Sequence, residues 1–187
     1  ASGQQGGGVI HLGGSYQGLD ENIRNAKATY IGKDVKISAS AGMVGDGGEV
    51  VVWADETTRF YGNIESIGGE VGGNGGRVEV SGKESLLFNG SVDLSATNGE
   101  FGSLLLDPQK LSVVADSEDE SDHIHDSEAG GQVDFSDIEE ATIKASTLVN
   151  LLDSGKVNLT ASELISIDSA ISSESSNELQ IVSDGDV

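Results

Sequence analysis

The stretch from Gly47 to Ile67 reads GGEVVVWADETTRFYGNIESI, and the stretch from Gly75 to Ser95 reads GGRVEVSGKESLLFNGSVDLS. The two align without a gap at an offset of 28 residues. Seven aligned pairs are identical, namely Gly47/Gly75, Gly48/Gly76, Val50/Val78, Val52/Val80, Glu56/Glu84, Phe60/Phe88 and Gly62/Gly90. A repeat of this length predicts an array of similar structural units, each of which buries its apolar side chains against its neighbours.

Apolar residues alternate with other residues within each unit. Val50 and Val52 are two positions apart, as are Val78 and Val80. This spacing points both side chains of a pair to one face of a strand, whereas the glycines between the apolar runs are typical of turns. Short strands, glycine turns and a fixed period together predict an all-β solenoid.

Looser copies of the pattern occur on both sides of the repeat. They are GGGVIHL at 6–12, ATYI at 28–31, VKISA at 35–39, VNLTA at 157–161, ISI at 165–167 and LQI at 179–181. At about 20 to 30 residues per coil, the chain is expected to hold about six or seven coils. We therefore expect three regions, which are Gly-rich β-helix repeats over 1–115, an acidic insertion over 116–132 and further coils over 133–187.

One segment has the pattern of a helix. Leu148, Leu151 and Leu152 would share one helical face. Ser146 is a candidate N-cap, and Gly155 is a typical stop. We expect one short helix near 146–154, packed outside a coil or filling a gap in it.

The chain is strongly acidic. It has 32 Asp and Glu residues against 10 Lys and Arg, and its formal net charge is −22. Phosphate backbones and anionic lipid surfaces would be repelled, so we expect no nucleic-acid partner. The longest apolar runs, such as 50–54, are far too short to cross a bilayer, so we expect no membrane insertion. The absence of cysteine excludes disulfides and thiol catalysis.

Several short motifs occur together in the first part of the chain. They are LGGSYQG at 12–18, NAK at 25–27, GGEVVVWAD at 47–55, TTRFYGNI at 57–64, GGNGGRVEVSGK at 72–83 and LLLDP at 104–108. In this combination the chain resembles, as far as about residue 110, the repeat region of filamentous-haemagglutinin-type exoproteins of the two-partner secretion pathway. The remaining residues match only the general solenoid pattern.

The resemblance implies a right-handed parallel β-helix, export through an outer-membrane transporter, and a secreted or bacterial cell-surface location. Such proteins mostly attach to host cells, to other bacteria or to polysaccharide, so a receptor of one of these kinds is the expected partner. We therefore expect a structural or adhesive segment and not an enzyme. No N-terminal secretion domain is recognisable, and a strand-like pattern continues close to Val187, so we expect an internal segment of a longer chain.

An acidic tract is the feature that the repeat leaves without a role. Residues 116–128 read DSEDESDHIHDSE and hold seven carboxylates. This density could supply the six to eight oxygens that Ca²⁺ prefers, and the candidate ligands are Asp116, Glu118, Asp119, Glu120, Asp122 and Asp126. Neither an EF-hand loop nor a calcium-binding nonapeptide is present, so a solvated insertion between coils, held open by self-repulsion, is the favoured interpretation, and a calcium site is the alternative. No other cofactor is expected.

Two aromatic residues of the repeat are candidate ligand contacts. Trp53 and Tyr61 are strand residues that could stack on sugars if they are exposed. Trp53 is out of register with Val50 and Val52, so it is expected to face outward. For an outward aromatic ring of this kind, packing under a loop is the alternative interpretation.

The histidines and the repeat arginines are interpreted more simply. His11 lies in the first strand pattern and is expected to face outward. His123 and His125 would share one face of an extended segment, but no third metal ligand has a recognisable spacing. Arg59 and Arg77 sit in repeat positions and are expected to be surface charges.

Two alternatives to an adhesive segment remain open. The first is a carbohydrate-active β-helix enzyme, a glycosidase or polysaccharide lyase, which needs two carboxyl groups roughly 5 to 10 Å apart. Acidic residues are so frequent that close pairs arise by chance, and the sequence assigns no catalytic residue. The second is a calcium-stabilised, carbohydrate-binding solenoid in which the acidic tract holds the metal.

Overall fold

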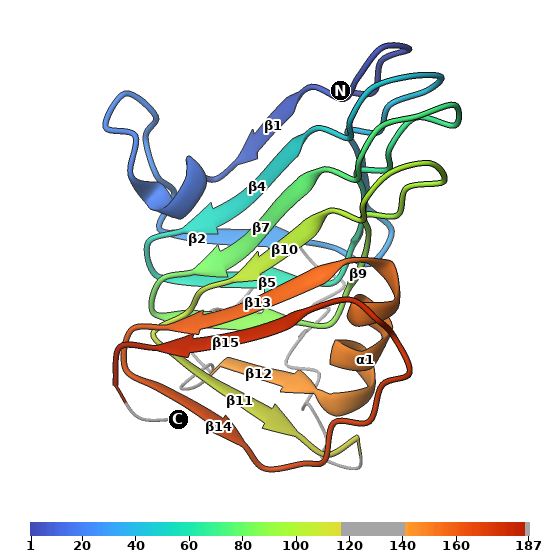
Figure 1. Ribbon diagram of the computed structural model, residues 1–187. Helices are drawn as coiled ribbons and strands as arrows, with labels where there is room; N and C mark the ends of the chain where they lie inside the picture. The colour runs from blue at the N-terminus through green and yellow to red at the C-terminus, as the bar shows by residue number, and fades with distance from the viewer. Residues whose placement is uncertain (117–140, 186–187) are drawn as a thin grey trace.

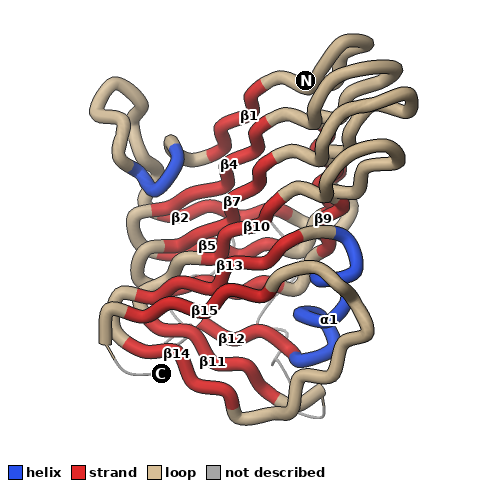
Figure 2. The backbone as a smooth tube through the Cα atoms, in the orientation of Figure 1, coloured by secondary structure: helices blue, strands red, loops and turns tan. Residues whose placement is uncertain are grey.

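The computed structural model describes residues 1–116 and 141–185 (Figure 1). In these ranges the chain is mostly β-structure, with three parallel sheets, one α-helix and one short 3-10 helix, η1 (Tyr16–Gly18). Figure 2 shows the strands lying side by side, joined by turns and longer loops. The prediction of an all-β chain with one short helix is confirmed at this level.

The strands form two six-stranded sheets and one three-stranded sheet. Sheet 1 contains, in order, β1 (Val9–Leu12), β4 (Glu49–Ala54), β7 (Arg77–Gly82), β10 (Ser103–Leu106), β13 (Lys156–Ala161) and β15 (Leu179–Ser183). Sheet 2 contains β14 (Leu164–Ile167), β11 (Lys110–Val114), β12 (Ala141–Lys144), β8 (Ser85–Phe88), β5 (Thr57–Phe60) and β2 (Ala28–Ile31). Sheet 3 contains β3 (Lys36–Ser38), β6 (Asn63–Glu65) and β9 (Ser91–Asp93).

The 28-residue repeat matches the register of one strand pair in each of the three sheets. Val50 pairs with Val78 in sheet 1, and Phe60 pairs with Phe88 in sheet 2. Strands β6 and β9 pair at the same offset in sheet 3. The two phenyl rings stack with their centroids 5.2 Å apart and their planes 16° from parallel. Equivalent residues of successive units therefore form continuous rows in a shared core.

The paired glycines lie where successive units approach closely. A Cβ atom on Gly47 would lie 2.3 Å from the carbonyl oxygen of Ser66. A Cβ atom on Gly75 would lie 1.8 Å from the carbonyl oxygen of Leu94. Side chains do not fit at such distances from backbone atoms, so glycine is required for the turn that leads into β4 and β7.

Most strands lie where the sequence pattern predicts them. The looser N-terminal copies correspond to β1, β2 and β3, and the C-terminal copies correspond to β13, β14 and β15. The pattern gives no individual prediction for β10, β11 or β12. Strands on both sides of the acidic tract contribute to the same sheets and to the same core.

Helix α1 (Ala145–Ser154) confirms the predicted helix. Leu148, Leu151 and Leu152 are buried on one face, and Gly155 follows the last helical residue. No helix in the described ranges is long enough and apolar enough to cross a lipid bilayer.

The prediction that Ser146 caps this helix is wrong. Ser146 lies inside the first turn, and its backbone N–H donates to a carboxylate oxygen of Asp116 at 3.0 Å. This hydrogen bond lowers the pKa of the fully exposed Asp116 side chain. A carboxylate from a neighbouring segment therefore takes the role that a local serine was expected to play.

One strand departs from sequential order. β12 follows β11 in the chain but lies between β8 and β11 in sheet 2. Helix α1 comes next and contacts β9, the last strand of sheet 3 (Figure 1), where the Leu94 N–H donates to the Ser154 carbonyl at 3.1 Å. In a further regular unit, strands would lie beside β8 and β9. Here β12 lies beside β8, and α1 lies beside β9.

Candidate functional site

A loop between β1 and β2 lies over the outer face of sheet 1. We call residues 13–27 the covering loop; it contains η1, which contacts β4 (Figure 1). Gly13, Gln17 and Gly18 have φ values of 80°, 53° and 64°, which allow the backbone to turn back onto the sheet. A Cβ atom on Gly18 would lie 2.7 Å from the Trp53 indole, so the glycine lets the backbone rest directly on the ring.

Trp53 faces outward from β4 and yet is only 4% exposed. Its indole N–H donates to Oδ1 of Asp55 at 3.1 Å. Asn25 of the covering loop donates to the same oxygen at 2.9 Å. Trp53 is thus packed under a loop, as the alternative interpretation has it, and its ring faces offer no open platform for a ligand.

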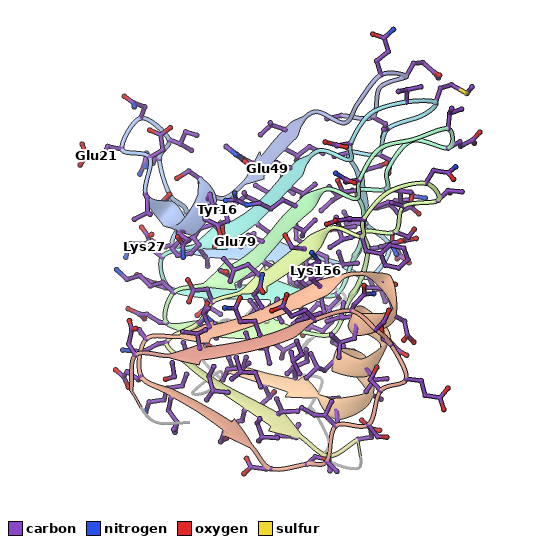
Figure 3. All side chains as sticks on the ribbon, viewed as in Figure 1. Tyr16, Glu21, Lys27, Glu49, Glu79 and Lys156 are labelled. Atoms are coloured by element: carbon purple, nitrogen blue, oxygen red, sulfur yellow. The ribbon has the colours of Figure 1, made fainter. Side chains whose placement is uncertain are left out.

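Glu79 is a fully buried carboxylate on β7, beneath η1 (Figure 3). Its Oε2 accepts the backbone N–H of Gln17 at 2.8 Å, and its Oε1 has no hydrogen-bond partner among the described residues. Burial raises the pKa of Glu79 to about 7, and the Asp107 carboxylate adds to the rise. Hydrogen bonds from Gln17 and Ser81 oppose it. A buried carboxyl group that titrates near neutral pH is a candidate acid or base.

Gln17 joins Glu79 to a second carboxylate. Its side-chain Nε2 donates to Oδ2 of Asp107 at 3.0 Å. Asp107 follows β10, and its backbone N–H donates to Oγ of Ser81 at 3.2 Å. Gln17 is therefore the link between two acidic groups that come from different strands.

Arg77 contacts Tyr16, the first residue of η1. Its guanidinium carbon lies 3.6 Å from the centroid of the Tyr16 ring, a cation–π contact, and its Nε lies 3.9 Å from the Glu49 carboxylate. Burial raises the pKa of the Tyr16 hydroxyl, while the neighbouring Arg77 charge opposes the rise. The Arg77 side chain is 49% exposed, so its prediction as a surface charge is confirmed.

A cavity of about 360 Å³ opens at the corner between sheets 1 and 2, which we call the corner cavity. The turns of four successive strand connections line it, each with at least one polar side chain, and the covering loop forms one wall. The lining residues are 17–19 of the covering loop, Trp53 at the end of β4 and Asp55 after it, Lys83 after β7, Asp107 and Pro108 after β10, and Ser162 after β13. Carboxylates, an ammonium group, an amide and a hydroxyl thus surround one space.

No protein-family model matches this chain, and no curated protein matches it either. The interpretation of the site therefore rests on its own chemistry. The corner cavity offers donors and acceptors to a polar ligand, and Asp107 is part of its lining. Glu79 is fully buried beneath η1, so its carboxyl group offers acid–base chemistry only if the covering loop moves.

Tyr61, the second candidate ligand contact, is half-buried, and its ring centroid lies 5.9 Å from that of Tyr30. It does not line the corner cavity, so its role as a ligand contact stays a prediction. Arg59 was expected at the surface, but it is fully buried, so that prediction is wrong. The motif TTRF does not distinguish the two cases, because every residue of β5, on both faces, is buried.

The candidate calcium ligands are only partly covered by the structure. Asp116 is described, and its carboxylate caps α1. Glu118, Asp119, Glu120, Asp122 and Asp126, together with His123 and His125, lie outside the described residues. Within residues 1–116 and 141–185, no three His, Asp or Glu side chains gather as metal ligands. His11 lies near Glu49, with its Nε2 3.4 Å from a carboxylate oxygen.

Sequence reasoning missed the group formed by Gln17, Glu79 and Asp107. Gln17 is 62 residues from Glu79 and 90 residues from Asp107, so no local motif joins them. One signal was available, because Glu79 replaces the apolar Val51 of the preceding unit. An acidic residue at a position that is apolar in the neighbouring unit marks a face that some other segment can cover.

Proposed function

We propose that this chain is a right-handed parallel β-helix segment of a large bacterial adhesin, secreted or displayed at the cell surface. In this role it mediates attachment or acts as a rigid stalk. The main support is that the 28-residue repeat coincides with the register of one strand pair in each of the three sheets. An array of this kind gives a stiff body that becomes longer with each added unit, and its turns present similar side chains at regular spacing.

The connections between strands support the solenoid part of the proposal. The chain passes from β4 through β5 and β6 to β7, which lies parallel to β4 in the same sheet. Crossovers between parallel strands of one sheet are right-handed in nearly all proteins. An experimental structure of the chain tests this part, and a left-handed crossover between β4 and β7 would contradict it.

The family-like motifs support the adhesin part, because they meet at one place. The motif LGGSYQG supplies η1, WAD supplies Trp53 and Asp55, SGK supplies Lys83, and LLLDP supplies Asp107. Residues that are far apart in the sequence thus build one corner of the molecule. Motifs that come together at one place support the resemblance more specifically than each short motif does alone.

Two measurements test the proposed function. Antibodies against the chain should label intact cells of the bacterium that makes it; labelling only after permeabilisation would contradict surface display. The purified chain should bind host cells, bacterial cells or matrix polysaccharide if it mediates attachment. Surface display without such binding would assign it the stalk role.

A carbohydrate-active enzyme is a second candidate, and one observation favours it. Glu79 has a pKa of about 7 and is linked through Gln17 to Asp107. A raised pKa is expected of a general acid in a glycosidase. Incubation with neutral glycans and polyuronides tests this candidate. New reducing ends or unsaturated products that disappear in Glu79→Gln would support it, and the adhesin proposal predicts none.

A further inference from the structure

We propose that the corner cavity is a binding subsite for one neutral hexose unit of a glycan. This inference rests on the proposed adhesive function and names a ligand class and a place for it. The cavity volume of about 360 Å³ lies at the lower end of the range of small-molecule sites, which is about 300 to 1,000 Å³. It is therefore sized for a small ligand or for one unit of a longer one.

The polar groups of the cavity match a ligand that both donates and accepts hydrogen bonds. Oδ1 of Asp55 accepts from Trp53 and Asn25, and Oδ2 of Asp107 accepts from Gln17. The second oxygen of each carboxylate has no hydrogen-bond donor among the described residues. The Lys83 ammonium and the Ser162 hydroxyl have no hydrogen bond or ion pair within the described residues, and both residues are exposed. Sugar hydroxyls can donate to the carboxylates and accept from the ammonium group.

The apolar part of the cavity lies beside these polar groups. Leu19 of the covering loop is 74% exposed, although it is a large apolar residue. Pro108 and Trp53 line the same space. A pyranose ring has C–H faces as well as hydroxyls, so a site that combines a few apolar surfaces with convergent polar groups suits it.

The charge of the cavity selects against acidic ligands. Asp55 and Asp107 outnumber Lys83, and the whole chain carries a formal charge of −22. Sialylated sugars, uronates and phosphates would meet a net negative potential. A neutral hexose meets no such penalty, and for that reason we assign the site to neutral sugars.

A second hollow, of about 510 Å³, is less suited to a ligand. It runs along the paired glycines near the start of β4 and β7. Its charged side chains already have partners. Arg77 lies 3.9 Å from Glu49, and Lys156 lies 3.6 Å from Glu100, which is outside the lining. The Asp46 carboxylate accepts the Asn74 backbone N–H at 2.7 Å. The corner cavity instead keeps a free ammonium group and a free hydroxyl among the described residues.

Trp53 makes the test specific, because it is the only tryptophan of the chain. The full chain is screened on an array of neutral glucose, galactose and mannose oligosaccharides beside sialylated and uronate-containing ones. The best neutral oligosaccharide is then titrated while the Trp53 indole N–H signal is followed by NMR. We expect neutral glycans to bind and to shift this signal, and acidic glycans to bind less.

Two variants change the cavity, and one serves as the control. Lys83→Ala removes the ammonium donor and should weaken binding about tenfold, as expected for a hydrogen bond to a charged group. Ser162→Phe places a ring at the cavity wall and should abolish binding. Lys33→Ala alters an exposed lysine that lies outside the cavity and should bind as the wild type does. Melting midpoints check that all three fold.

Two outcomes overturn the inference. The first is the absence of neutral-glycan binding, and the second is binding that neither shifts the Trp53 signal nor responds to Ser162→Phe. Cell attachment of the wild type and of Ser162→Phe separates this inference from the proposed function. Equal attachment of both refutes the subsite and leaves the adhesive function standing. A Trp53 shift without any cell attachment supports the subsite and refutes the attachment role.

Discussion

At the scale of single residues, Glu79 illustrates how a covering segment changes the chemistry of a strand. Glu79 pairs with Val51 in sheet 1, and both residues are fully buried on the same outer face. Valine tolerates this position without cost, whereas an ionised carboxylate with an incomplete set of hydrogen bonds does not. The protonated form is favoured instead, which is why the pKa of Glu79 rises to about 7.

Glu79→Gln should change the pH dependence of stability. Between the ordinary pKa of 4.5 and about 7, the folded protein binds a proton that the unfolded chain releases. Stability should therefore fall as the pH rises through this range, by roughly 3 kcal/mol in all, and then level off. The variant lacks this loss and should be the more stable protein at pH 8. Urea unfolding from pH 5 to 8, followed by Trp53 fluorescence, measures the difference.

Glu84→Gln is the matched control for this prediction, because Glu84 is exposed. Its pH profile should run parallel to that of the wild type. A Glu79→Gln profile that also runs parallel would mean that Glu79 is not protonated on folding, and would remove the reason for considering it as an acid.

At the scale of elements, the turn into each strand of sheet 1 depends on close backbone contact. The contrast between Gly47 and Gly72 makes this testable: a Cβ atom on Gly47 would lie 2.3 Å from a backbone oxygen, while one on Gly72 meets nothing within 4 Å. Gly47→Ala should destabilise the protein by about 2 kcal/mol or more, and Gly72→Ala by less than about 0.5 kcal/mol. Chemical denaturation of the two variants checks this. Equal unfolding midpoints would contradict the close backbone contact at Gly47.

Helix α1 should be needed for the packing of residues 141–185. Leu148 is fully buried against the core, whereas Asn150 of the same helix is exposed. Leu148→Ala should cost about 2 to 5 kcal/mol, because it removes buried methyl groups next to β9. Asn150→Ala should leave the unfolding midpoint nearly unchanged. A Leu148→Ala variant that unfolds at the same midpoint as Asn150→Ala would contradict packing of α1 as the source of its contribution.

The sequence predicted elements better than it predicted their order and their partners. The offset between Val50 and Val78 is visible in the sequence, and one strand pair in each sheet uses the same offset, because equivalent apolar residues pack best on each other. The position of β12 between β8 and β11 is not visible, since periodicity reports the length of a unit and not the order in which strands pair. The burial of Glu79 was missed for a similar reason, because it depends on a loop 62 residues away.

At the scale of the whole molecule, charge is the dominant property. The described ion pairs, such as Lys27–Glu56 and Lys36–Glu65, involve five of the ten Lys and Arg residues, all at exposed or partly exposed positions. Exposed pairs contribute little, so most of the negative charge stays uncompensated. Mutual repulsion among carboxylates on a body of this kind opposes the compact state and is screened by salt.

The melting midpoint should therefore rise when NaCl is increased from about 10 mM to about 150 mM, where the Debye length falls to about 8 Å. The same measurement with divalent cations decides the role of the acidic tract. If residues 116–128 are a solvated insertion, CaCl₂ and MgCl₂ at equal ionic strength should raise the midpoint equally, because both act only by screening. A rise specific to Ca²⁺, with heat of binding in calorimetry, would instead support the calcium-stabilised solenoid, since only a built site of six to eight oxygens distinguishes Ca²⁺ from Mg²⁺.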